Sequence, residues 1–232
     1  MKAPLITFDV FSALINSRHG GGRFLQSLAD QRDWPSRGAD LYDDWDARNK
    51  HAQARARSWV TFAQLAEHAL RATYKHYALP GDVHADCLEL LASIAGWPLW
   101  PDVEPALAAI GRRYRLGILS NVDDDILASS KVWPLIDPAN ALTSQRLGCY
   151  KPDPRIYVIA RDRFGVQLHV AASARDVRGA GEAKLPCVRV ARPGHHVDPD
   201  GPEPTHTITD LRELAEWPRA PRHFPRPAGP AR

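Results

Sequence analysis

The sequence predicts an α/β fold with a mainly parallel sheet and a helical segment inserted after the first strand. An opening strand, Leu5 to Asp9, is apolar or β-branched until it ends in the carboxylate of Asp9. The stretch from Phe24 to about Leu79 has the periodicity of amphipathic helices and no strand pattern. From Leu116 onward, strand and helix patterns alternate, as they do in βαβ units. We therefore expect both ends of the chain to build one core, with a helical insert between them.

The remaining elements follow from apolar runs, helical periodicity and proline or glycine breaks. Further strands are predicted at Leu116–Ser120, Ala141–Thr143, His169–Ala172, Cys187–Val190 and Thr205–Ile208. Further helices are predicted at Cys87–Ile94, Val103–Tyr114, Asp124–Ser129, Pro154–Phe164 and Gly179–Ala183.

Breaks in these patterns divide the chain. We predict a core formed by residues 1–15 and 100–217, a helical insert over 16–99, and a disordered tail rich in proline and arginine over 218–232. Gly20, Gly21 and Gly22 are interpreted as a flexible turn that, with the Trp97 to Pro101 stretch, forms a hinge.

Composition excludes several classes of protein. The 232 residues carry a net charge of +3 and no basic stripe with interleaved aromatic residues, so no nucleic-acid partner is expected. There is no apolar run of roughly 20 residues and no signal-like N-terminus, which predicts a cytoplasmic protein without a membrane partner. The three cysteines are widely spaced and indicate neither disulfides nor zinc. His195 and His196 lie in a Gly/Pro/Asp loop and are interpreted as solvated.

Five polar residues, in four stretches of the chain, lie where predicted strands end or helices begin. Asp9 ends the first strand, Ser120 and Asn121 end the second, Lys151 precedes a proline-marked helix start, and Asp176 lies in a polar turn after the next strand. Right-handed crossovers between parallel strands bring such ends to one sheet edge, where ligands bind in open α/β sheets.

Each of these positions also has a purely structural explanation. Asp9 can cap the following turn, and Ser120 can cap the helix that begins near Asp124. Lys151 can be a surface lysine before a helix, and Asp176 can pair with a neighbouring arginine at the surface.

In order and residue type, these four stretches resemble the haloacid dehalogenase superfamily of hydrolases. The likeness is strongest to the L-2-haloacid dehalogenase branch, whose first motif reads Asp, any residue, aromatic, Gly, Thr, Leu; here it stands as Asp9-Val10-Phe11-Ser12-Ala13-Leu14. The resemblance implies a Rossmann-like three-layer core. It also implies that the helical insert is a cap that closes over Asp9 and excludes water.

The resemblance further implies a reaction and its residues. Asp9 would attack the carbon of a small 2-haloacid and form an aspartyl ester, which water then hydrolyses. Lys151 would keep Asp9 ionised and oriented, and Asp176 would position or activate the water. Ser120 would hydrogen-bond the substrate carboxylate or the nucleophile. The residues expected to bind substrate are Phe11, Ser12, Asn121, Tyr157, Ser173 and Arg48. No metal or cofactor is expected.

Two substitutions separate this reaction from phosphate transfer. Phosphatases of the superfamily carry a second aspartate two residues after the nucleophile, where this chain has Phe11. They also carry an Mg²⁺-binding acid in a region that here reads Ala171-Ala172-Ser173. An alkoxide leaving group needs a proton and a phosphoryl group needs a cation, whereas halide needs neither. Metal-independent displacement at carbon is therefore favoured.

Two other functions remain open. One is an Mg²⁺-dependent phosphatase that binds the ion through Asp9 and Asp176 alone. The other is a catalytically idle binding protein, because Ala13, Ser173 and Asp46 depart from the dehalogenase template.

The insert raises two further expectations. Family members receive the departing halide with a cap arginine directly after a tryptophan; here Asp46 follows Trp45, which leaves Arg48, or alternatively Arg18, for that role. An exposed apolar face carrying Trp45 or Trp59 would support a homodimer.

Overall fold

The fold is built on one six-stranded sheet. The computed structural model describes residues 3–56, 58–196 and 198–217. The strands are β1 (Leu5–Phe8), β2 (Arg115–Ser120), β3 (Ala141–Thr143), β4 (Val166–Ala171), β5 (Cys187–Val190) and β6 (His206–Ile208). Their order is β3-β2-β1-β4-β5-β6, and every described pairing is parallel. The predicted α/β architecture is confirmed.

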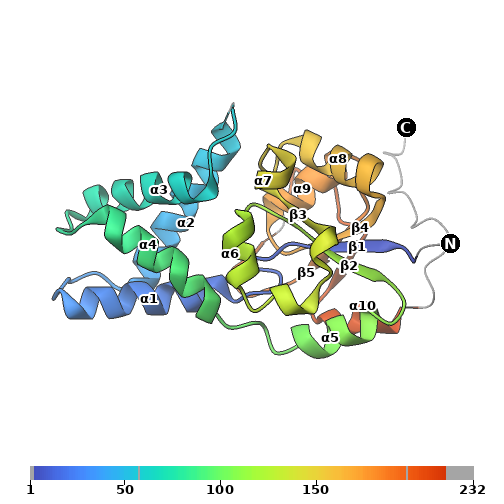
Figure 1. Cartoon of the computed structure of the whole chain (residues 1–232), viewed down its shortest axis with the longest axis horizontal. Helices are drawn as coiled ribbons and strands as arrows, with labels where there is room; N and C mark the ends of the chain where they lie inside the picture. Colours follow the sequence, from blue (N-terminus) through green and yellow to red (C-terminus); the bar gives the residue numbers. More distant parts are fainter. Residues whose placement is uncertain (1–2, 57, 197, 218–232) are drawn as a thin grey trace.

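Helices cover both faces of this sheet (Figure 1). One face carries α7 (Ser144–Leu147), α8 (Pro154–Phe164) and α9 (Ala174–Glu182). The opposite face carries α5 (Val103–Ile110) and α10 (Leu211–Glu216), while α6 (Asp124–Ser129) follows β2. These layers form the expected three-layer, Rossmann-like core.

The central strand β1 is buried on both sides, which explains its apolar sequence. Leu5 belongs to the apolar cluster beneath α8 and α9, whereas Ile6 and Phe8 belong to the cluster on the other face. Strands β2 and β4 lie on the two sides of β1. The strands that follow β1 in the chain are first added on one side of it, as β2 and β3, and then on the other side, as β4, β5 and β6. The edge beyond the carboxyl end of β1 is therefore the topological switch point, where α/β folds bind ligands.

The remaining helices form a separate helical unit beside the sheet (Figure 1). It comprises α1 (Ser17–Gln31), α2 (Gly38–Arg55), α3 (Phe62–Tyr77), α4 (Val83–Ser93) and a short 3₁₀ turn, Ile94–Gly96. The chain enters and leaves this unit side by side: the Asn16 N–H donates to the Pro98 carbonyl at 2.8 Å, and the Trp100 N–H donates to the Leu14 carbonyl at 3.0 Å.

The glycine run is part of a buried helix, so its interpretation as a flexible turn is wrong. Gly20, Gly21 and Gly22 all lie inside α1. A Cβ at Gly20 would lie 2.3 Å from the Trp97 ring, and one at Gly21 would lie 2.4 Å from the Tyr42 ring. The glycines therefore allow aromatic side chains to pack directly against the α1 backbone.

Several other expectations need correction. Helix α9 begins at Ala174, five residues before the predicted start, so Asp176 lies in its first turn rather than in a loop. The short helices α7 and α10 were not predicted. Trp45 is 3% exposed and its indole N–H donates to the Ala66 carbonyl, so it does not lie on an exposed apolar face. Trp59 stacks on Tyr150. The predicted disordered tail lies outside the described residues.

Within the described ranges, none of the helices combines the length and the apolar character that a bilayer crossing requires.

The contact between α1 and α2 gives a matched pair of glycine substitutions. A Cβ at Gly38 would lie 2.2 Å from the Gln26 backbone nitrogen and 2.4 Å from the Gly22 carbonyl oxygen, whereas the nearest atom to a Cβ at Gly22 is 3.5 Å away. We expect Gly38→Ala to lower the free energy of unfolding by about 1–3 kcal/mol through overpacking against backbone. Gly22→Ala should raise it by roughly 0.5–1 kcal/mol through helix propensity. Urea denaturation measures both, and equal shifts would contradict the packing.

Candidate active site

Three acidic or hydroxyl side chains meet at the carboxyl edge of the sheet because three neighbouring parallel strands end there. Asp9 directly follows β1, Ser120 ends β2, and Asp176 lies in the first turn of the helix after β4. The Asp9 N–H donates to the Val170 carbonyl at 2.9 Å, which extends the β1–β4 ladder by one residue. Rigid strands therefore fix the position of Asp9.

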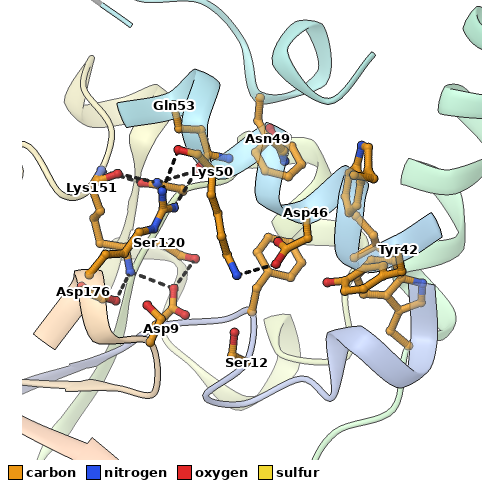
Figure 2. Close-up of a pocket in the computed structure, with 18 residues that line it drawn as sticks. Asp9, Ser12, Tyr42, Asp46, Asn49, Lys50, Gln53, Ser120, Lys151 and Asp176 are labelled. Carbon is orange, nitrogen blue, oxygen red and sulfur yellow. Dashed lines mark hydrogen bonds and ion pairs between the residues drawn. The ribbon is translucent and has the colours of Figure 1, made fainter. Parts of the chain in front are cut away.

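Lys151 lies between the two carboxylates (Figure 2). Its Nζ is 2.8 Å from Asp9 Oδ1, 2.5 Å from Asp176 Oδ2 and 2.9 Å from the Leu119 carbonyl oxygen. These three bonds use all three ammonium protons. Ser120 Oγ also donates to Asp9 Oδ1, at 2.9 Å.

Asp9 therefore keeps one carboxylate oxygen unengaged. Both of its side-chain hydrogen bonds end on Oδ1, and Oδ2 accepts none from the described residues. The Asp9 carboxylate is held at one oxygen by two donors and lines the pocket, which leaves Oδ2 available to a ligand.

Asn121 fixes the backbone of Lys151. The Lys151 N–H donates to Asn121 Oδ1 at 2.7 Å, and Asn121 Nδ2 donates to the Lys151 carbonyl at 3.0 Å. The Lys151–Pro152 peptide bond is cis. Asn121 also lines the pocket, so it contributes both to the position of Lys151 and to the wall around Asp9.

Asp176 is fully enclosed by donors. Besides Lys151, the Tyr157 hydroxyl donates to Asp176 Oδ1 at 2.8 Å, and His169 Nε2 lies 3.2 Å from both carboxylate oxygens. The other nitrogen of His169 is 3.1 Å from the Thr7 hydroxyl. His169 was not predicted as a site residue, because a histidine inside an apolar strand gives no distinctive signal. Tyr157, predicted to bind substrate, does not line the pocket, and its hydroxyl contacts Asp176 instead.

These contacts determine the charges of the cluster. Burial raises the pKa of the Asp176 carboxyl, but the charges of Lys151 and His169 outweigh burial and keep that pKa below its ordinary value. Burial lowers the pKa of the Lys151 ammonium, but Asp176 and Asp9 outweigh it and raise that pKa above its ordinary value. The lysine and Asp176 therefore remain an ion pair through the neutral range.

The pocket over this cluster lies between the sheet edge and the helical unit and encloses about 560 Å³, including its open mouth. Nearly all predicted site residues of the core line it, namely Asp9, Phe11, Ser12, Ser120, Asn121, Lys151, Ser173 and Asp176. Phe11 stacks on Phe62 of α3 at 5.9 Å between ring centroids, which makes an apolar wall shared by both units.

Two predicted arginines lie elsewhere. Arg48 pairs with Asp44 on its own helix, with Arg48 Nε 2.6 Å from Asp44 Oδ2, and does not line the pocket. The alternative, Arg18, pairs with Asp43 at 2.8 Å and also lies outside the pocket. The expectation that Arg48 faces the substrate is therefore wrong in its geometry.

Helix α2 supplies most of the opposite wall with residues that sequence reasoning missed. Spaced three or four residues apart on one helical face are Tyr42, Trp45, Asp46, Asn49, Lys50 and Gln53. Lys50 forms an ion pair with Asp46 (Figure 2). The sequence pattern that could have identified this wall is the polar stripe of Asp46, Asn49, Lys50 and Gln53, which recurs at helical spacing.

Ser12 adopts a left-handed backbone conformation, with φ of 75°. In the dehalogenase motif that this segment resembles, the same position is glycine, the residue that adopts this conformation without steric cost. Ser12 thus adopts, as a serine, a conformation that glycine adopts more easily. Ser12 lines the pocket, and its hydroxyl has no hydrogen-bond partner among the described residues.

Arg175 and Asp123 are among the core residues that bond to the helical unit. Arg175 donates to the Lys50 carbonyl at 2.9 Å and to Gln53 Oε1 at 2.8 Å. The Asp123 carboxylate accepts the N–H groups of Phe62 and Ala63, at 3.0 and 3.1 Å, where α3 begins. These bonds hold α2 and the start of α3 against the sheet edge and so shape the pocket.

Within the described part of the chain, no group of three or more His, Cys, Asp or Glu side chains is arranged to hold a metal ion. The space between Asp9 and Asp176, where a cation would bridge two carboxylates, is taken by the Lys151 ammonium.

Comparison with known proteins identifies the family. The family model for haloacid dehalogenase-like hydrolases matches residues 3–180. The chain belongs to this family.

Three individual proteins illustrate what this chain is similar to. The chain is 29% identical to (S)-2-haloacid dehalogenase 4A of Burkholderia cepacia over 219 residues, covering 90% of this chain and 88% of that protein. A crystal structure of a dehalogenase superposes with a TM-score of 0.77 at 26% identity, covering 92% and 95% of the two chains. A phosphoserine phosphatase of Thermus thermophilus is 34% identical over 126 residues, which covers 51% of this chain and 50% of that protein.

The buried ion pair makes a pH-dependent prediction about stability. Asp176→Asn leaves the Lys151 ammonium with one carboxylate fewer, and we expect a loss of roughly 3–5 kcal/mol in the free energy of unfolding at pH 7. Because the folded-state pKa of Asp176 lies below its unfolded value of about 3.9, its contribution is complete above about pH 5 and declines as the pH falls toward the folded value.

Chemical denaturation between pH 7 and pH 3 tests this expectation. The difference between Asp176→Asn and the parent protein should shrink below about pH 4. Asp162→Asn, which removes a solvent-exposed partner of Arg161, serves as the control and should change stability little. A difference that stays constant down to pH 3 would contradict the assigned pKa direction.

Proposed function

We propose that this hydrolase is a metal-independent 2-haloacid dehalogenase that works through an aspartyl ester on Asp9. The observation that supports it is the asymmetry of Asp9: Oδ1 is fixed by Lys151 and Ser120, while Oδ2 has no partner among the described residues and belongs to a pocket wall. A nucleophile needs this combination of a fixed position and a free lone pair.

The reaction divides into two steps. Asp9 Oδ2 attacks C2 of the 2-haloacid, a new C–O bond forms, and the carbon–halogen bond breaks as halide leaves with its electron pair. Water then adds to the ester carbonyl of Asp9, the acyl–oxygen bond breaks, and a 2-hydroxy acid is released with a proton. Lys151 holds Asp9 Oδ1 at 2.8 Å and so orients the carboxylate that attacks.

Asp176 fits a positioning role better than that of a base. Its pKa lies below the ordinary aspartate value, which makes its carboxylate a weak proton acceptor. Its three donors, Lys151, Tyr157 and His169, keep it in one orientation. It therefore fixes the lysine that in turn fixes the nucleophile.

The substrate carboxylate has donors available on the core side. Ser12 and Ser173 both line the pocket, and their hydroxyls make no hydrogen bond with a described residue. Two free hydroxyls beside a free nucleophilic oxygen are suited to orienting a carboxylate next to the carbon under attack.

Lys50 is the candidate to receive the halide. Of the three cations that line the pocket, Lys151 is saturated by its three bonds and Arg175 is held by α2. Lys50 has Asp46 as its charged partner and keeps further ammonium protons for an anion. This assigns to Lys50 the role that the sequence suggested for Arg48, with the helical unit acting as a cap.

The phosphatase alternative draws support from the partial likeness to phosphoserine phosphatase. Two features of the site weigh against it. Phe11, stacked on Phe62, occupies the position of the acid that would protonate an alkoxide. The Lys151 ammonium lies where two carboxylates would share Mg²⁺.

Halide release tests the reaction directly. We expect the protein to release chloride or bromide from a panel of 2-haloacids at the same rate with and without EDTA. Asp9→Asn should lower this rate by at least about 10³-fold, because the amide oxygen is a poor nucleophile. In a single turnover in H₂¹⁸O with enzyme in excess, the hydroxyl of the product should contain ¹⁶O from Asp9, and the label should enter the Asp9 carboxylate.

Each other outcome selects an alternative. Phosphate release that EDTA abolishes would replace the dehalogenase with the phosphatase. Ligand binding that persists in Asp9→Asn, with no turnover by the parent protein, would indicate an idle binding member. A product hydroxyl labelled with ¹⁸O would exclude the ester even if halide is released.

A pair of substitutions on α2 tests the halide site. Lys50→Gln should reduce kcat at least about 10-fold, because the leaving anion loses its cation, while Arg48→Gln should stay within about twofold of the parent. Steady-state kinetics with one 2-haloacid measures both. A larger effect for Arg48→Gln would restore the original assignment and contradict the pocket geometry.

A further inference from the structure

The cap wall of the pocket contains a polar group for which the displacement reaction has no use. Asn49 lies one helical turn from both Asp46 and Gln53 on the pocket face of α2. Its side chain is 3% exposed, and its amide makes no hydrogen bond with any described residue. Its Oδ1 is among the few buried polar atoms of the described residues without a partner.

An unpaired amide is costly in such a position. Leaving a buried polar group unsatisfied costs roughly 1–3 kcal/mol, and an apolar residue would avoid that cost. The other amide on this face shows the contrast: Gln53 Oε1 accepts bonds from Asn121 Nδ2 at 2.9 Å and from Arg175 at 2.8 Å. Gln53 joins cap to core, whereas Asn49 has no structural partner. Because Asn49 lines the pocket, a bound ligand can supply that partner.

We propose that Asn49 selects 2-haloacids that carry a hydroxyl group beyond C2. This inference rests on the proposed dehalogenase function and names its substrate class. A hydroxyl can donate a hydrogen bond and accept one at the same time. It can therefore donate to the oxygen of the Asn49 amide and accept from the nitrogen of the same amide.

Other substituents fit this wall less well. A cationic substituent would meet Lys50, Lys151 and Arg175, and the nearby Asp46 is already paired with Lys50. A purely apolar substituent would leave the Asn49 amide without a partner in the pocket wall. A neutral hydroxyl avoids both penalties, which gives discrimination of the kind that buried polar groups provide against analogues lacking their partner.

Binding of the reaction products tests the inference on the resting enzyme. Lactate and glycerate differ by one hydroxyl on the carbon beyond C2. With both enantiomers of each, calorimetry should show the parent protein binding glycerate at least about 10-fold more tightly than lactate. Asn49→Leu should abolish that preference, because leucine offers no polar group to the extra hydroxyl. Asn49→Asp, which keeps an acceptor, should retain a preference for glycerate.

Kinetics on the matching substrates separates this inference from the proposed function. The parent protein should show a higher kcat/KM for 2-chloro-3-hydroxypropionate than for 2-chloropropionate, and Asn49→Leu should equalise the two values. No halide from either compound, with the glycerate preference intact, would refute dehalogenation and leave the hydroxyl subsite. Halide from both with equal kcat/KM and equal product affinities, or a preference that survives in Asn49→Leu, would overturn the role of Asn49.

Discussion

The ion pair of Lys151 with two buried carboxylates is the interaction on which the site depends. Without the ammonium, Asp9 and Asp176 would place two like charges that repel each other at one buried sheet edge. With it, all three lysine protons are engaged, two by carboxylates and one by the Leu119 carbonyl. The lysine therefore cannot turn to a substrate. Its hydrogen bond fixes Oδ1 of Asp9, and Oδ2 has no hydrogen-bond partner among the described residues.

The core half of the site was predictable because topology alone brings it together. Asp9, Ser120 and Asp176 follow apolar strands, and in a parallel sheet strands that start at one edge end at the other. The strand predictions at Ala141–Thr143 and Cys187–Val190 match the structure residue for residue, since both are short apolar runs between clear breaks. No side-chain geometry was needed for this part, only the order of the elements.

The helical half was not predictable in the same way, because helical phase decides which side chain faces the pocket. Arg48 and Lys50 are two residues apart, which turns them by about 200° around α2 and puts them on nearly opposite faces. Arg48 faces Asp44, which also accepts from Thr73 of α3 at 2.7 Å. The glycines of α1 were predicted wrongly for a related reason. A residue without a side chain permits a flexible turn and close helix packing equally well. Only the aromatic rings of Trp97 and Tyr42, which pack against these glycines, show that packing is the reason for them.

In the proposed mechanism, the two halves of the site separate reaction from selection. Asp9 and the side chains that hold it, Ser120 and Lys151, belong to the core, whereas Lys50 and Asn49 come from α2. Arg175 holds that helix, and Asp123 caps the start of α3. Burial raises the pKa of the Asp123 carboxyl above its ordinary value. The hydrogen bonds from the two N–H groups of α3 act in the opposite direction, because they stabilise the charged carboxylate. The Lys50 and Asn49 side chains make no hydrogen bond to Asp9, Lys151 or Asn121, unlike Gln53, which accepts from Asn121. In this proposal, substitutions at Lys50 and Asn49 therefore change the substrate accepted while the contacts that hold Asp9 stay in place.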